Sequence, residues 1–530
     1  MSIFMPRAKR SDRIKTAAQT VFGGINHNAS ARDGEIYDMK NMSSDAYPFA
    51  SSRSKRYFSD FDTYTNIFNI GNDIYTVYKA GKKYSLMKNS TPLDDRYYSE
   101  NIEQIVKMGH RILIFPQKRY IDTDGSNKDL ESICSGTADF TDGTYKGETA
   151  EENTIKMSGN HTGAFEVGDA VEISGDCSEK NKKTAVIREI EYSGGYTFFR
   201  FYEHCFKKES VKAITMKRSV PDMDFVFVHE NRLWGFKGST IYASKLGDPK
   251  NFNVFDGLST DSYALEVLSA GNFTAAISYL GYPLFFKEDA VYKVYGSKPS
   301  DFQVIGSARL GVAEKSGKSP AVANETLFYL SRSGVCAYKG GIPSVISAPL
   351  GDGHFSDGVG GSDGKKYYIS MKDAGGTHRL YVYDTAKGLW HAEDNTKATA
   401  FAKSEAFYML ADGKLYSDRE TELSESEEAD TDIDSCLEFA PSAEGLPQRK
   451  GISKLLIRFE LEAGASVTVK FSADGGEYIK VGEITAAARK SCYLPIIPRR
   501  CDNFKLRIEG KGRWRLLSLA KQYYSGSELL

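Results

Sequence analysis

Short apolar runs separated by polar turns recur along most of the chain. Each unit consists of an apolar strand, a polar turn, a second strand and then a strand rich in Tyr and Val. Alternating β-prone residues bounded by Asx-Gly or Gly-Asn turns predict β-hairpins. About seven such units are present: Ile67 to Tyr78, Ile105 to Tyr120, Phe225 to Ser244, Ala275 to Tyr295, Ala321 to Tyr338, Lys366 to Tyr383 and Phe401 to Tyr416.

This recurrence predicts a β-propeller. A small sheet cannot bury both of its faces alone, and radial stacking against neighbouring sheets covers them while leaving only short edges. Trp234 follows Asn231 at the start of one hairpin, where an aromatic ring is expected to fill the space between two sheets. The predicted fold class is all-β, with a β-propeller of about seven blade-like units, an inserted small β-barrel and a C-terminal β-sandwich.

The insertion follows the second unit, where the regular pattern stops. A strand beginning at Val167-Gly168-Asp169 and alternating strands over 185–190 and 197–201 predict a small closed barrel. The barrel is assigned to residues 131–217, between propeller parts at 21–130 and 218–419. A spacer or contact module is the favoured role, and a ligand-binding barrel is the alternative.

A second change of pattern follows the propeller. The acidic run at 420–429 is too charged to join a core and predicts a solvated linker. Beyond it, clean period-two alternation over 455–461, 466–472 and 504–509 predicts a β-sandwich in residues 430–530.

Composition agrees with a large β-rich protein. The 530 residues exceed a usual single core, and 32 Tyr, 30 Phe and 48 Gly favour strands and tight turns. A net charge of -1 gives no general attraction to nucleic acid or to an anionic membrane. No transmembrane run is present, and Met1 to Lys15 is too polar for a secretory signal. We therefore expect no membrane insertion and synthesis in a cytoplasm.

Local motifs for catalysis or metal binding are missing from the sequence. The seven cysteines are scattered without a Cys-x-x-Cys pair, so neither a cofactor nor a metal is predicted. No His-x-x-x-His or Gly-x-Ser-x-Gly motif is found. The loop at 352–358 offers oxygen ligands for calcium, but a polar loop between sheets is favoured because EF-hand spacing is missing. The expectation is that the chain has no catalytic residue and is not an enzyme.

Basic residues form a candidate contact surface, beside the exposed aromatics and sheet edges expected to form contacts between subunits. Residues 1–20 make a basic arm, and phosphate contacts need only positive charge. A flexible tail that docks on a neighbouring subunit is the favoured reading of this arm. Strand alternation places three cations of the sandwich on its solvent side, where they could meet an acidic partner. The candidate contact residues are Arg7, Lys9, Arg10, Arg458, Lys505 and Arg507.

Three stretches of the chain resemble a family of bacteriophage tail proteins. They are Phe22-Gly23-Gly24-Ile25-Asn26 near the start, the central run from Asn231-Arg232-Leu233-Trp234 through Gly247-Asp248-Pro249 to Val291-Tyr292-Lys293, and the ending Ile497-Pro498-Arg499-Arg500 with Tyr524-Ser525-Gly526. Together these stretches are similar to the packaged-DNA stabilisation and tail-nozzle group.

The resemblance implies a structural protein of the virion tail, made in the cytoplasm of the bacterial host. It implies self-association into a ring, contacts with adjacent tail or connector proteins, and a part in retaining and gating DNA, including non-specific contact with packaged DNA. The alternative function is a carbohydrate-binding or carbohydrate-cleaving β-propeller of a tail fibre or baseplate.

Overall fold

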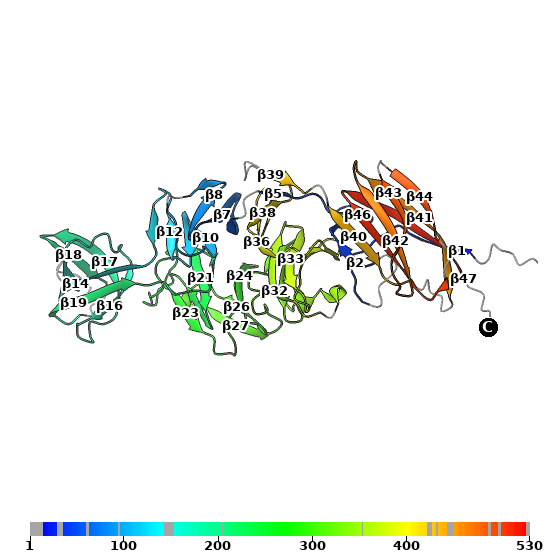
Figure 1. Ribbon diagram of the computed structural model, residues 1–530. Coiled ribbons are helices and arrows are strands. Elements are labelled where there is room, and N and C mark those ends of the chain that lie inside the picture. Colours follow the sequence, from blue (N-terminus) through cyan, green and yellow to red (C-terminus); the bar gives the residue numbers. More distant parts are fainter. Residues whose placement is uncertain are drawn as a thin grey trace, which may run out of the picture. The chain divides into compact units, whose positions relative to one another are not determined.

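The computed structural model describes twelve stretches of the chain, and its regular secondary structure is almost entirely β-strand (Figure 1). The described residues are 14–28, 35–59, 63–93, 96–142, 153–202, 206–351, 353–420, 427–430, 433–442, 449–485, 489–496 and 500–525. The chain divides into two compact units, one formed by Phe68–Val312 and the other by Met1–Ile67 with Ala313–Leu530.

Four small antiparallel sheets follow one another along the first part of the chain, up to Val312. Their strands are β6 (Tyr64–Ile70), β7 (Asp73–Ala80), β8 (Lys83–Lys88) and β9 (Thr91–Pro92); β10 (Gln104–Met108), β11 (Arg111–Phe115), β12 (Arg119–Ile121) and β13 (Asn127–Asp129); β20 (Phe225–His229), β21 (Arg232–Lys237), β22 (Thr240–Ala243) and β23 (Tyr263–Glu266); and β24 (Ala275–Tyr279), β25 (Tyr282–Phe286), β26 (Ala290–Tyr295) and β27 (Gln303–Ala308), with the 3₁₀ helix η2 (Pro299–Asp301) between the last two.

Neighbouring sheets of this unit pack face to face through their apolar side chains. The first strands lie against one another, β10 on β20 and β20 on β24. Trp234 on β21 is only 1% exposed and packs on Phe285 of the next sheet, with ring centroids 6.3 Å apart. This is the inter-sheet position predicted for Trp234, and the arrangement confirms the predicted propeller class.

The segment between β13 and β20 forms a closed six-stranded barrel. Its interior is filled by aromatic and aliphatic side chains, including Phe140, Phe199 and Phe201, each no more than 1% exposed. The packed interior fits a spacer or contact module better than a ligand-binding barrel. The strands are β14 (Ser132–Phe140), β15 (Thr154–Ser158), β16 (Ala170–Gly175), β17 (Thr184–Ser193), β18 (Tyr196–Phe201) and β19 (Glu209–Arg218).

Three further sheets of the same kind lie in the other unit. Their strands are β28 (Ala321–Ala323), β29 (Thr326–Ser331), β30 (Gly334–Tyr338) and β31 (Ser344–Val345); β32 (Ser356–Ser362), β33 (Lys366–Lys372), β34 (His378–Asp384) and β35 (Leu389–Ala392); and β36 (Ala398–Lys403), β37 (Phe407–Ala411) and β38 (Lys414–Ser417), with η3 (Ala348–Leu350) before β32.

The last of these sheets is completed by a strand from near the start of the chain. β5 (Tyr57–Ser59) pairs antiparallel with β38, and β39 (Glu427–Ala429) pairs with the other edge of β5. An N-terminal segment therefore supplies the fourth strand of the last propeller sheet. This pairing joins residues more than 350 positions apart, and it fixes the path of the preceding segment, Met42–Arg56.

A β-sandwich of two sheets forms the rest of this unit. One sheet contains β1 (Ile14–Gln19), β3 (Met42–Ser43), β4 (Ala50–Ser52), β41 (Lys450–Leu461), β44 (Arg489–Pro495), β45 (Arg500–Cys501) and β47 (Trp514–Ser525), and the other contains β2 (Ile36–Lys40), β40 (Asp434–Phe439), β42 (Ser466–Ala473), β43 (Ile479–Thr485) and β46 (Phe504–Lys511). The inner faces meet in one apolar core that includes Leu455, Phe459 and Ile508. The predicted inserted barrel and sandwich are both confirmed as fold elements.

The N-terminal residues differ from their predicted place. Strands β2 to β4 belong to the sandwich, although residues 21–130 were expected to form the first part of the propeller. The absence of a side chain at Gly24 lets this segment pack closely against β35. A Cβ atom at this position would lie 2.4 Å from the Trp390 carbonyl oxygen. Residues 14–19 of the expected basic arm pair with β47, and residues 427–429 of the expected acidic linker form β39.

Candidate functional site

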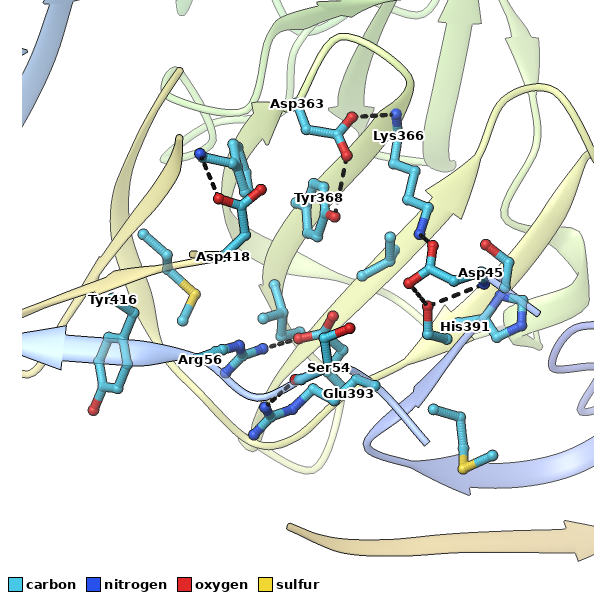
Figure 2. Close-up of a pocket in the computed structure, with 18 of the residues that line it drawn as sticks. Asp45, Ser54, Arg56, Asp363, Lys366, Tyr368, His391, Glu393, Tyr416 and Asp418 are labelled. Atoms are coloured by element: carbon cyan, nitrogen blue, oxygen red, sulfur yellow. Dashed lines mark hydrogen bonds and ion pairs between the residues drawn. The ribbon is translucent and has the colours of Figure 1, made fainter. Parts of the chain in front are cut away.

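A polar cavity lies where the segment Met42–Arg56 passes over the last two propeller sheets (Figure 2). The cavity has a volume of about 260 Å³ and is lined by this segment, by β33 to β35 and by β36 to β38. We call Met42–Arg56 the strap. The lining has equal numbers of cationic side chains and carboxylates, namely Arg53, Lys55, Arg56, Lys366, Asp45, Asp363, Glu393 and Asp418.

Two of the lining residues, Arg53 and Arg56, anchor the end of the strap. Arg56 forms ion pairs with Glu393 and, at 3.3 Å, with Asp394. Arg53 donates to Asp430 at 2.6 Å and to the amide oxygen of Asn41 at 2.9 Å. Burial and the neighbouring charge of Arg53 lower the pKa of Arg56, and the carboxylates nearby partly offset that effect. Both guanidinium groups are therefore held by acids that come from much later in the chain.

A second set of polar contacts lines the cavity near the start of the strap. Lys366 Nζ donates to Asp45 at 2.6 Å, and Ser43 Oγ donates to the other oxygen of the same carboxylate at 2.7 Å. Burial raises the pKa of Asp45, but Lys366 and Ser43 outweigh that effect and hold the pKa below its usual value. Asp45 is thus an ionised hydrogen-bond acceptor. Its side chain remains 55% exposed, so it can also meet a ligand.

Aromatic rings and a neutral histidine complete the cavity. Tyr368 packs on Phe407 with ring centroids 4.4 Å apart, and its hydroxyl donates to Asp363 at 3.3 Å. Burial raises the pKa of Tyr368 well above its usual range. Burial also lowers the pKa of His391 to about 4, with Lys366 acting in the same direction. Tyr368 and His391 are therefore uncharged near pH 7.

The combined arrangement is a site for a neutral polar ligand. Its charges already balance, so an ion gains little net attraction on entering. Exposed carboxylate and hydroxyl oxygens offer several hydrogen bonds, while the aromatic rings offer apolar contact. Pockets for drug-sized ligands span about 300 to 1,000 Å³, so this cavity suits a smaller group such as one sugar ring.

The basic residues predicted as a contact surface do not gather in one place. Lys505 and Arg507 lie together on β46, where both pair with Glu438 at 3.6 Å. Arg458 lies on β41 in the other sheet of the sandwich and donates to Ser491 at 3.2 Å. Its side chain is on the outer face of that sheet. The remaining candidates, Arg7, Lys9 and Arg10, lie outside the described residues.

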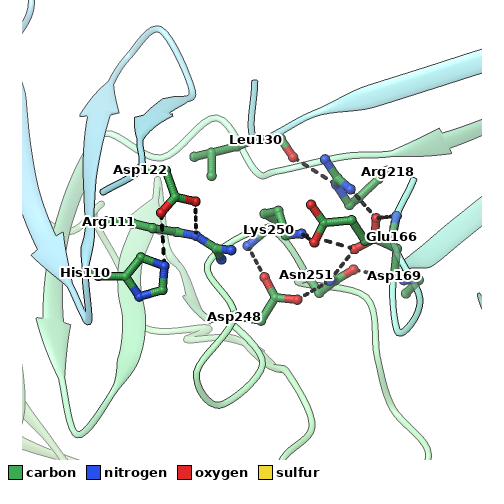
Figure 3. Close-up of polar contacts among 11 residues, drawn as sticks. His110, Arg111, Asp122, Leu130, Glu166, Asp169, Arg218, Asp248, Lys250 and Asn251 are labelled. Carbon is green, nitrogen blue, oxygen red and sulfur yellow. Dashed lines mark hydrogen bonds and ion pairs between the residues drawn. The ribbon is translucent and has the colours of Figure 1, made fainter. Parts of the chain in front are cut away.

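A second cluster of buried charges lies at the base of the barrel (Figure 3). Asp169, only 1% exposed, forms an ion pair with Arg218 and accepts a hydrogen bond from Asn251 at 3.1 Å. Lys250, 2% exposed, lies 3.8 Å from Asp169 and donates to Glu166 at 2.6 Å. The loop that carries the Gly-Asp-Pro motif thus supplies Lys250 and Asn251, which join the barrel to the sheet of β20 to β23.

The two segments through which the chain enters and leaves the barrel are also linked by hydrogen bonds and an ion pair. Arg218 Nε donates to the Leu130 carbonyl at 3.0 Å, and Lys118 Nζ donates to the Val220 carbonyl at 2.7 Å. Lys118 also pairs with Glu131 at 3.0 Å. Because these side chains satisfy one another, the cluster has the character of a structural joint rather than of a binding site.

No protein-family model matches the sequence, and no curated protein matches it. Solved structures do match. They include an exo-β-1,3-galactanase from Phanerochaete chrysosporium (8% identity, 55% of this chain and 92% of that one, TM-score 0.21), the endosialidase of phage phi92 (10%, 70% and 55%, TM-score 0.19) and the sialidase of Trypanosoma rangeli (8%, 96% and 95%, TM-score 0.25).

These matches correct one expectation. The sequence predicted that the chain is not an enzyme, whereas the matched structures are those of a galactanase, an endosialidase and a sialidase. That prediction is therefore wrong. It was based on missing local motifs, whereas the residues of a propeller site come from distant segments of the chain. At TM-scores of 0.25 or less, the matches carry no argument for a particular activity of this chain.

No helix within the described residues is long and apolar enough to cross a membrane. No group of three or more His, Cys, Asp or Glu side chains in this part of the chain could hold a metal ion.

Burial of neutral His391 predicts a loss of stability in mild acid. The unfolded chain binds a proton at this histidine near pH 6.5, whereas the folded protein binds it only near pH 4. The free energy of unfolding should fall by about 2 to 3 kcal/mol between pH 7 and pH 4.5. Denaturant unfolding across this range measures the slope, and His391→Gln should flatten it. Equal slopes for the two proteins would contradict the assignment.

The charged cluster around Asp169, Arg218 and Lys250 is called the barrel joint. Removing one of its charges should strongly lower the stability of the protein. Asp169→Ala leaves Arg218 and Lys250 buried without their shared acid, so the free energy of unfolding should fall by about 3 to 5 kcal/mol. Glu189→Ala is the matched control, because Glu189 is a 55% exposed partner of Arg200 in the same barrel. The control should cost less than about 1 kcal/mol. Similar losses in the two variants would show that the joint has no special role.

Proposed function

We propose that this chain is a carbohydrate-binding β-propeller protein of a bacteriophage tail, with its binding site in the cavity under the strap. The observation that carries the proposal is the lining of the cavity. Its charges balance, Asp45 is ionised and partly exposed, and Tyr368 and His391 are neutral. Hydrogen-bond acceptors beside aromatic rings suit the hydroxyl groups and apolar faces of a sugar.

The tail assignment is supported by the sequence resemblance at the two ends and the centre of the chain. The virion is the proposed location, with synthesis in the host cytoplasm. The ring-forming nozzle role, with contacts to neighbouring tail proteins and to packaged DNA, remains a prediction of that resemblance. Lys505 and Arg507 do not support the predicted contact with DNA, because Glu438 and Glu509 already pair with their charges.

Removal of the charge on Asp45 tests the site. The protein should bind a neutral cell-surface glycan, found by screening an array and quantified by calorimetry. Asp45→Asn should weaken that binding by about tenfold or more, because a hydrogen bond to a charged group contributes about 1.5 to 3 kcal/mol. The matched control is Asp73→Asn, since Asp73 forms a similar exposed pair with Lys88 at 2.8 Å on another sheet.

The same samples can be assayed for release of new reducing ends, which separates binding from cleavage. Glycan binding that is unchanged in Asp45→Asn would contradict the proposed site. Failure of every neutral glycan to bind would contradict the proposed function.

A further inference from the structure

The outer edge of one propeller sheet lacks the usual protection against pairing with another chain. Natural edge strands are short, charged, interrupted by proline or covered. The other outer strands follow this rule. They contain a proline (β9), charged residues (β13, β23, β39) or only two residues (β31), or they have mostly buried side chains (β35). β27 is six residues long with the sequence Gln-Val-Ile-Gly-Ser-Ala, and five of the six residues are exposed.

Only one side of β27 is paired within the described residues, where it lies antiparallel to β26. Val304 and Gly306 lie on the side toward the core: Val304 packs against the apolar cluster, and a Cβ atom on Gly306 would lie 2.4 Å from the Tyr292 ring. The odd-numbered residues lie on the other face, where Ile305 is 50% exposed. The free edge therefore offers unpaired backbone groups beside an exposed apolar side chain.

We infer that β27 is a self-association site, at which a second copy of this chain pairs antiparallel with the same strand. A two-fold axis at Ile305 places each Ile305 opposite the other and each Gln303 opposite the second copy's Ser307. The same register brings the strand end that follows Asp301, the last residue of η2, to the strand end that precedes the second copy's Arg309. Along this face, apolar residues thus meet apolar residues and polar residues meet polar residues.

The charges at the two ends of the strand favour this occupant. Asp301, which lies at the end of η2 and 3.7 Å from Lys298, and Arg309 are both exposed and flank an uncharged strand. Antiparallel pairing brings the strand end beside Asp301 to the strand end beside Arg309, whereas parallel in-register pairing would place the two Arg309 side chains at the same end. A contact of this kind uses the same surface on both copies, so it closes at two copies and does not itself build a ring.

Cysteine cross-linking of the full-length protein tests the register. Residues directly opposite each other across an antiparallel pair have Cβ atoms about 4.5 to 5.5 Å apart, close enough for a disulfide after small adjustments. Ile305→Cys should therefore give a covalent dimer on mild oxidation. Ser307→Cys is the matched control, because its own copy would lie four residues away, about 14 Å along the strand. A Ser307→Cys dimer, or none for Ile305→Cys, would overturn this register.

Charge reversal measured by sedimentation equilibrium tests the partner without oxidation. The unaltered protein should form dimers, and Asp301→Arg should lose them because a second arginine then lies at the strand end that meets the second copy's Arg309. The double variant Asp301→Arg with Arg309→Asp should regain them. Val345→Lys, on the outer strand β31, should leave the dimer unchanged. A strictly monomeric unaltered protein, or a double variant that stays monomeric, would refute the inference.

Discussion

The ion pairs of Arg53 and Arg56 fix the path of the strap in the unit that contains the sandwich. Arg53 is bound by Asp430, and Arg56 is bound by Glu393 and Asp394. A buried guanidinium without an acid would cost several kcal/mol, so the strap can run here only if these carboxylates are in place. Once it does, β5 reaches the edge of β38 and the strap forms one wall of the cavity.

The repeated hairpins could be predicted from sequence because their causes are local. Glu230 and Asn231 have φ angles of 45° and 55°, as the tight turn between β20 and β21 requires. Apolar alternation around such turns places residues such as Trp234 in a core. Each of the predicted units accordingly corresponds to an observed sheet.

The N-terminal strands and the cavity could not be predicted because their causes are distant. β2 pairs with β40, about 400 residues away, and the sequence of β2 does not show which partner it takes. In the sequence alone, Arg53 and Arg56 look like ordinary surface residues. Only the structure shows that they pair with Asp430 and Glu393. Alternation correctly predicts that the side chains of Lys505 and Arg507 leave the core, but it does not reveal the Glu438 side chain that meets both.

The cavity and the barrel joint show two uses of balanced charge. At the joint, Asp169, Arg218 and Lys250 are each 5% exposed or less, and they satisfy one another. In the cavity, Asp45 keeps more than half of its side chain exposed while its charge is balanced by Lys366. Spare hydrogen-bonding capacity beside aromatic rings distinguishes a surface that can bind a ligand from one that only fixes two parts of the fold.

A crystal structure of the protein soaked with its best-binding neutral glycan would test the proposed binding site directly. A sugar ring should lie in the cavity, with a hydroxyl donating to Asp45 and a ring face near the aromatic side chains around Tyr368. A glycan bound elsewhere on the protein, with the cavity under the strap empty, would show that the cavity is not the binding site.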